Sequence, residues 1–226
     1  MATLQNWLDE VLEQADGCPQ EVALRALERA GREFFRDSTA WIDWITGLDV
    51  TPNTSIDLNS GAPTGTQVAY AFFATLLDSG GKRYVLRPMN GYPIPAPDPV
   101  DYPTNFVLDG YSTLTVVPDV KSAKTGELDV LCALMPLDRN TVLPDQSFDH
   151  YHEAILSGAL GKLMSTTDRP YTNLELAKFH LNRFRVLIAR FRDEARKRYG
   201  IVDQMVAFPV RGWAKPYGTR RFSGWG

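Results

Sequence analysis

The chain has 226 residues, of which 44% are hydrophobic and 23% charged, with a formal net charge of −3. This composition is that of a soluble globular protein with a good core, and the negative balance argues against a protein whose whole surface binds nucleic acid. Cys18 and Cys132 make no disulfide framework, and the acidic N-terminus does not resemble a signal peptide. No apolar run approaches the roughly 18 residues that span a bilayer. We therefore expect a protein of the reducing cytoplasm without a membrane partner.

The first 36 residues are predicted to form two amphipathic helices. Apolar residues recur at helical spacing over residues 3–15, and Gly17 ends this helix because glycine readily adopts the left-handed conformation of a C-terminal cap. Pro19 opens the second helix, which runs to about Arg36. Neither helix can bury its apolar stripe alone, so both need partners.

Residues 37–143 are predicted to form an inserted antiparallel β domain, as a small sheet or sandwich. Apolar residues alternate over 68–76, a turn follows at 78–81, and residues 83–88 continue as a second strand. The run AFFATLL within this region also fits a buried helix.

The rest of this region contains a loop and further strands. Five prolines indicate a long irregular loop over residues 90–103. Asp109 and Gly110 lie between two β-rich runs and predict a two-residue hairpin turn with positive φ at both positions. Residues 128–134 supply another strand.

Two further helices are predicted in residues 144–200. The first carries an apolar stripe formed by Phe148, Tyr151, Ile155, Ala159 and Leu163. Its Gly158 and Gly161 each cost roughly 1 kcal/mol relative to alanine, so we expect another backbone to approach closely there. The second helix covers 173–199, with Asn173 as its N-cap, and would span roughly 40 Å.

This long helix has two kinds of surface. Its apolar stripe consists of Leu174, Ala177, Leu181, Phe184, Leu187, Ile188, Phe191 and Ala195. Its other faces are mainly basic, and this pattern fits either a solvated surface or a contact surface. The sequence therefore predicts an α+β fold for the whole chain. Helices from 1–36 and 144–200 close into an antiparallel bundle, the β domain 37–143 projects from it, and residues 201–226 leave as an extended tail.

Candidate chemical groups are sparse. His150 and His152 are two apart and do not share a helix face, and His180 lies on another helix, so we expect no metal site. Cys18 lies near a helix N-terminus, which can lower a thiol pKa, but no base accompanies it, and Cys132 fits a buried apolar position. We expect no catalytic site and no cofactor.

The tail, residues 201–226, carries a net charge of +3, so the preceding 200 residues carry −6. It is rich in the residue types that anchor protein interfaces. The candidate partner-binding residues are Phe208, Arg211, Trp213, Lys215, Tyr217, Arg220, Arg221, Phe222 and Trp225. A protein partner is favoured over two alternatives, a tail that wraps onto its own body and a tail that binds single-stranded nucleic acid.

Three pieces of the chain resemble the adaptor, or head-to-tail connector, proteins of tailed bacteriophages, particularly those with short tails. They are PQEVALRALERAGREFFRDSTAW (19–41), NFVLDGYSTLTVVPDV (105–120) and LPDQSFDHYHEAILSGALGKLMS (143–165) with the long helix that follows. Within the third piece, HEAILSGALGKLM is the most informative run. The resemblance covers most of residues 19–199.

The resemblance implies a virion structural protein at the junction of capsid and tail, assembled in the bacterial cytoplasm. Such proteins form a homo-oligomeric ring, commonly of twelve copies, beneath the portal. Their β part faces tail proteins of the nozzle or hub, and their C-terminal segment grips the portal protein. Genomic DNA passes through the channel without specific binding. The alternative hypothesis is a nucleic-acid-binding module that uses the basic tail and the Arg-rich helix.

Overall fold

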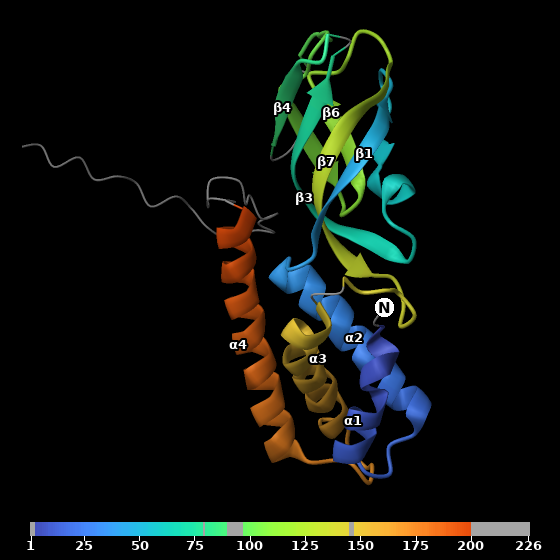
Figure 1. The fold of residues 1–226 in the computed structure, drawn as a ribbon, viewed down its shortest axis with the longest axis vertical. Helices are drawn as coiled ribbons and strands as arrows, with labels where there is room; N and C mark the ends of the chain where they lie inside the picture. The colour runs from blue at the N-terminus through green and yellow to red at the C-terminus, as the bar shows by residue number, and fades with distance from the viewer. Residues whose placement is uncertain (1–2, 79, 90–96, 145–146, 200–226) are drawn as a thin grey trace, which may run out of the picture.

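The computed structural model describes residues 3–78, 80–89, 97–144 and 147–199. A helical bundle and a barrel-like sheet are stacked end to end, so the described part of the chain is elongated (Figure 1). Helices from both ends of the chain pack together, and the sheet is built from the middle, as the predicted α+β layout requires. The predicted tail at 201–226, and residues 90–96 of the predicted loop, lie outside the described residues.

Four α-helices form the bundle, and their ends follow local signals. They are α1 (Leu8–Gln14), α2 (Gln20–Ser38), α3 (Ser147–Met164) and α4 (Leu174–Tyr199). The predicted first helix is divided, because a 3-10 turn at Leu4–Trp7 precedes α1. Pro19 is the N-cap of α2, and Thr39, in the left-handed conformation at φ 51°, ends that helix slightly later than predicted.

The two glycines of α3 allow the close helix packing that the sequence predicts. A Cβ at Gly158 would lie 2.9 Å from the ring of Phe184 and 3.0 Å from the Cβ of Ala30. A Cβ at Gly161 would lie 2.8 Å from the Cγ of Leu181. These contacts bring α4 close to α3 at both glycines and α2 close to α3 at Gly158. Close packing therefore offsets the low helix propensity of glycine.

Asn173 caps α4, because its side-chain Oδ1 accepts a hydrogen bond from the backbone N–H of Leu176 at 3.1 Å. We expect Asn173→Ala to lower the free energy of unfolding by about 1 kcal/mol, the usual cost of losing an N-cap. Urea denaturation followed by circular dichroism measures this change. Asn182→Ala is the matched control, because Asn182 is exposed within the same helix, and it should be neutral or slightly stabilising. Equal effects of the two substitutions would contradict the capping role.

Seven strands form one nearly closed sheet in the order β1-β7-β3-β4-β5-β6-β2. They are β1 (Ile42–Val50), β2 (Ile56–Asp57), β3 (Thr66–Leu77), β4 (Arg83–Pro88), β5 (Asn105–Asp109), β6 (Thr113–Val117) and β7 (Lys124–Pro136). AFFATLL lies in β3 and is therefore strand, not helix. The long strands β3 and β7 pair antiparallel, and β1 pairs with β7 on its other side. The two outermost strands, β1 and β2, contact each other and bring the sheet close to closure.

Two expectations for the sheet were wrong. β4 and β5 pair in parallel, with Arg87 opposite Asn105, so the sheet is mixed. Parallel pairing is possible here because 16 residues, 89–104, separate the two strands, which is long enough for a connection between parallel strands. The β5–β6 turn is also longer than predicted. Asp109 pairs with Thr113, and only Gly110 has a positive φ, which leaves a three-residue loop.

The bundle and the barrel have separate hydrophobic cores. The bundle core is centred on Phe34, Phe35 and Phe184, each at most 1% exposed. The barrel core lies inside the curled sheet and includes Leu76 and Phe106. Trp41, between α2 and β1, packs against both cores and joins them.

Candidate interaction surfaces

Helix α4 has a buried inner face that fixes it in the bundle. The residues of this face include Ala177, Phe184, Ile188, Phe191 and Ala195. Leu174 was expected in the same stripe but is 54% exposed. It is the first residue of α4, directly after the α3–α4 connection. Near the other end, Arg192 Nε donates a hydrogen bond of 2.7 Å to the backbone carbonyl of Asp37 at the end of α2. This bond ties the C-terminal half of α4 to the bundle end that meets the barrel (Figure 1).

The opposite side of α4 exposes a second apolar stripe. Leu176, Phe179 and Val186 are 45%, 56% and 67% exposed. Their spacings of three and seven residues place them on one side of the helix, with Phe179 and Val186 turned away from Phe184. The exposed residues Arg190 and Lys197 extend the same line toward the C-terminus, and the exposed carboxylate of Asp193 lies between them on this face. We name Leu176, Phe179, Val186, Arg190 and Lys197 the α4 outer stripe. The outer stripe was not predicted, because the longer apolar stripe of the inner face dominates the sequence pattern. A plot of the residues by helical angle would have shown both stripes.

The α4 helix is strongly basic. Residues 174–199 contain eight Lys or Arg residues against three acidic ones, a net charge of +5. Arg183 forms an ion pair with Glu153 of α3, which holds one of these cations within the bundle. Lys178, Arg185 and Lys197 are exposed, and no carboxylate among the described residues lies within ion-pair distance of them. These three cations are therefore available to a partner.

The opposite side of the bundle is acidic. Residues 4–24 contain five acidic residues, Asp9, Glu10, Glu13, Asp16 and Glu21, and no Lys or Arg. Within this segment, α1 packs against α2 and α3, whereas α4 packs against the other side of these two helices (Figure 1). We name the exposed acidic residues Asp9, Glu13 and Asp16 the α1 acidic face. Each chain thus carries a basic surface and an acidic surface on opposite sides of its bundle.

The three histidines lie apart, as the sequence predicts. His150 forms a pair with Glu194 of α4 at 3.1 Å, and His152 forms a pair with Glu10 of α1 at 2.8 Å. Burial, together with the nearby positive charge of Arg183, lowers the pKa of His180. Among the described residues, no group of three or more His, Cys, Asp or Glu side chains is arranged to hold a metal ion. His150 and His152 thus connect helices within the bundle.

Neither cysteine has the environment of an activated thiol. Burial raises the pKa of Cys132 to about 12, in the interior of the barrel. The helix N-terminus near Cys18 could have lowered the pKa of that thiol, but burial outweighs the hydrogen bond with Tyr171, and the pKa is raised. Both residues pack as small apolar side chains.

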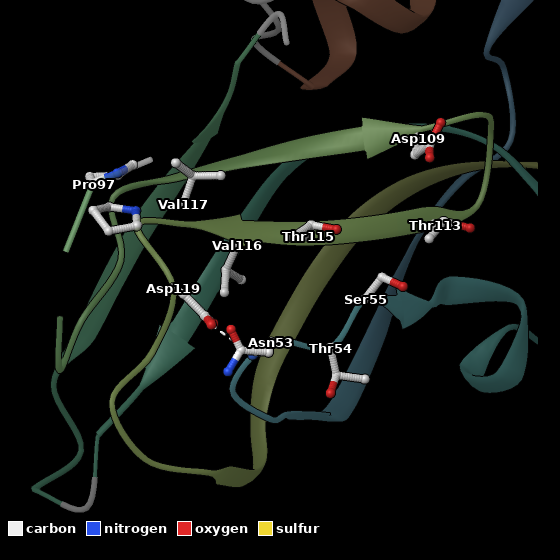
Figure 2. A pocket seen from close by; sticks show the side chains of 11 residues that line it. Asn53, Thr54, Ser55, Pro97, Asp109, Thr113, Thr115, Val116, Val117 and Asp119 are labelled. Atoms are coloured by element: carbon white, nitrogen blue, oxygen red, sulfur yellow. Dashed lines mark hydrogen bonds between the residues drawn. The ribbon is translucent and has the colours of Figure 1, made fainter. Parts of the chain in front are cut away.

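A hollow of about 430 Å³, lined by both apolar and polar groups, lies on the barrel (Figure 2). It is formed by the β1–β2 connection, strand β6 and the segment that follows that strand, and Pro97 lies across from Val117. Asp119 holds its shape, because one carboxylate oxygen accepts a 2.7 Å hydrogen bond from the N–H of Asn53 and the other accepts from the N–H of Val120. The described lining contains threonine hydroxyls and the carboxylate of Asp109, but no His, Cys, Lys or Arg. These groups offer hydrogen bonds to a partner.

The predicted tail residues, from Phe208 to Trp225, lie outside the described residues. No protein-family model matches the sequence, and a search of curated proteins finds no significant relative. Among the described helices, none combines the length and the apolar character needed to cross a bilayer. Within the described part of the chain, the surfaces on α4 and α1 are therefore the main candidates for a functional contact.

Proposed function

We propose that this protein is a non-enzymatic structural protein of a bacteriophage virion, an adaptor that joins the portal of the capsid to the tail. In this proposal, copies form a ring around the DNA channel, the barrel faces the tail proteins, and residues 201–226 bind the portal protein. The sequence resemblance to head-to-tail connector proteins motivates the assignment. The structure adds physical support at α4.

The observation that carries the proposal is how α4 is held. Its inner face is buried along most of its length, and Arg192 ties its C-terminal half to the end of α2. The helix therefore presents the basic, aromatic sequence that follows it from a fixed point beside the barrel (Figure 1). Fixing one end of a binding segment reduces the entropy lost when the segment binds. Such an arrangement suits an arm that anchors one large assembly to another.

Deletion of residues 201–226 tests the proposal. We expect the truncated protein to bind purified portal rings at least ~100-fold more weakly, because Trp, Tyr and Arg residues dominate interface energies. Its thermal unfolding should be unchanged, since both described cores lie outside the deleted segment. Surface plasmon resonance on immobilised portal measures the binding.

The matched control carries the same 26 tail residues in scrambled order, which keeps the net charge of +3. We expect the scrambled tail to fail as the deletion does, because an interface anchor needs its aromatic residues in a defined order. Full portal binding by the truncated protein would contradict the proposed role of the tail.

A nucleic-acid-binding module remains the second candidate, because α4 and residues 201–226 are both basic. That function requires affinity for DNA or RNA that falls steeply as salt is raised, since binding releases counterions from phosphates. A titration at two salt concentrations separates the candidates. The adaptor proposal expects weak binding at physiological salt, and tight binding that Arg190→Glu and Lys197→Glu abolish would favour the second candidate.

A further inference from the structure

The α4 outer stripe combines apolar and basic side chains in one line. Leu176, Phe179 and Val186 occupy its first half, and Arg190 and Lys197 occupy its second half, where two cations outnumber the single carboxylate of Asp193. Large apolar side chains that gather on one exposed face and are bordered by polar residues are a feature of protein interaction sites. The stripe therefore requires a partner that buries apolar groups and also supplies negative charge.

The same molecule carries a surface with that charge. The α1 acidic face consists of Asp9, Glu13 and Asp16, and residues 4–24 hold a net charge of −5 against +5 on α4. The two surfaces lie on opposite sides of one bundle, with α2 and α3 between them (Figure 1). They cannot meet within one chain, but they can meet between two copies. Val22, at the start of α2, is an exposed apolar residue within the same acidic segment, 38% exposed.

Two other occupants fit the stripe less well. The tail of the same chain has a net charge of +3, so the basic half of α4 repels it. Nucleic acid satisfies Arg190 and Lys197 but leaves Phe179 and Val186 without an apolar partner. A second copy supplies both negative charge and apolar surface.

We infer that the α4 outer stripe of one copy binds the α1 acidic face of a second copy. The inference rests on the proposed ring and names the surfaces that would form it. Because the two surfaces differ, a bound pair still offers one unused surface of each kind, the α1 acidic face on one copy and the α4 outer stripe on the other. Such a head-to-tail contact continues from copy to copy and closes into a ring if the rotation between neighbours allows. Opposite charges also set the direction of the contact, since two α4 helices repel each other.

Charge reversal tests this pairing without the portal. One variant carries Arg190→Glu and Lys197→Glu on α4, and the other carries Asp9→Lys and Glu13→Lys on α1. Sedimentation velocity measures self-association at low salt. We expect wild-type protein to associate, each variant alone to associate at least ~10-fold more weakly, and an equimolar mixture of the two variants to recover association. Recovery occurs because each reversed surface meets its complement on the other variant.

Two controls make the test specific. Arg83→Glu with Arg87→Glu changes the net charge as much as the α4 variant does, but on exposed positions of β4, and it should leave association unchanged. Val186→Asp should weaken association at high salt as well as at low salt, because it removes an apolar contact that salt does not screen. Thermal unfolding of every variant checks that the bundle is intact.

The possible failures are distinct. Wild-type protein that remains monomeric up to about 1 mM, or a mixture of reversed variants that does not associate, would overturn the inference. Either result leaves portal binding through the tail untouched, since that is measured with immobilised portal. Conversely, a truncated chain that still binds portal would overturn the role of the tail while self-association through α4 and α1 stands.

Discussion

Phe34→Ala is expected to lower the free energy of unfolding of the bundle by about 3–5 kcal/mol, the usual cost of truncating a buried phenylalanine. Phe34 is fully buried on α2, and its ring lies 5.2 Å from that of Tyr151 on α3 and 5.5 Å from that of Phe191 on α4. One side chain therefore contacts both neighbouring helices. Its removal leaves a cavity where three helices meet, and fixed backbones limit how far that cavity can collapse.

Phe179→Ala is the matched control, because it makes the same change at a phenylalanine that is 56% exposed on α4. We expect its cost to stay within about 0.5 kcal/mol. Urea denaturation at a protein concentration low enough to avoid self-association compares the two. Similar costs for the two substitutions would show that Phe34 does not have the central packing role assigned to it.

Gly158→Ala is expected to destabilise the protein by about 1–3 kcal/mol, although glycine to alanine normally stabilises a helix interior by about 1 kcal/mol. The sign reverses because the added Cβ would meet the ring of Phe184 at 2.9 Å and the Cβ of Ala30 at 3.0 Å. Phe184 is 1% exposed, so its ring cannot turn aside without displacing its own neighbours. The helices must separate instead.

A double-mutant cycle identifies the cause. In a Phe184→Leu background the large ring is absent, so Gly158→Ala should cost at least ~1 kcal/mol less than in the wild type. Urea denaturation of the four proteins gives the coupling energy. Additive costs, or a stabilising effect of Gly158→Ala alone, would exclude the close approach of α3 and α4 as the reason for this glycine.

Local patterns predicted the elements that depend on nearby residues. Helical spacing located α2 and α4, alternation located β3 and β4, and Asn173 marked the start of α4 correctly. Strand β1 was not predicted as a separate element. A register shift between Ile45 and Leu48, with Gly47 at φ 74°, breaks the alternation of buried residues on which strand prediction depends. The parallel pairing of β4 with β5 depends on the path of a long loop, which no local pattern encodes.

The candidate surfaces were predicted less well than the fold. The basic character of α4 was visible in the sequence, but its use as a solvated or a contact face was left open. The exposure of Phe179 and Val186 favours a contact surface over a solvated one. This exposure depends on which side of α4 packs against α3. The acidic residues of α1 became relevant only when the fold put them opposite α4. A pairing between surfaces of two copies cannot be read from one chain in linear order.

The separation of the two cores has a consequence for biosynthesis. All strands of the barrel lie within 42–136, whereas α2 must wait for α3 and α4, more than a hundred residues later in the chain. Chains are synthesised at about 5–20 residues per second, and complete units fold as they emerge from the ribosome. The barrel can therefore fold while the apolar stripe of α2 is still uncovered, and the bundle closes only after translation has passed Tyr199. We therefore expect nascent chains to pass through a stage with a folded barrel and an uncovered α2, at which a chaperone would bind the exposed apolar stripe.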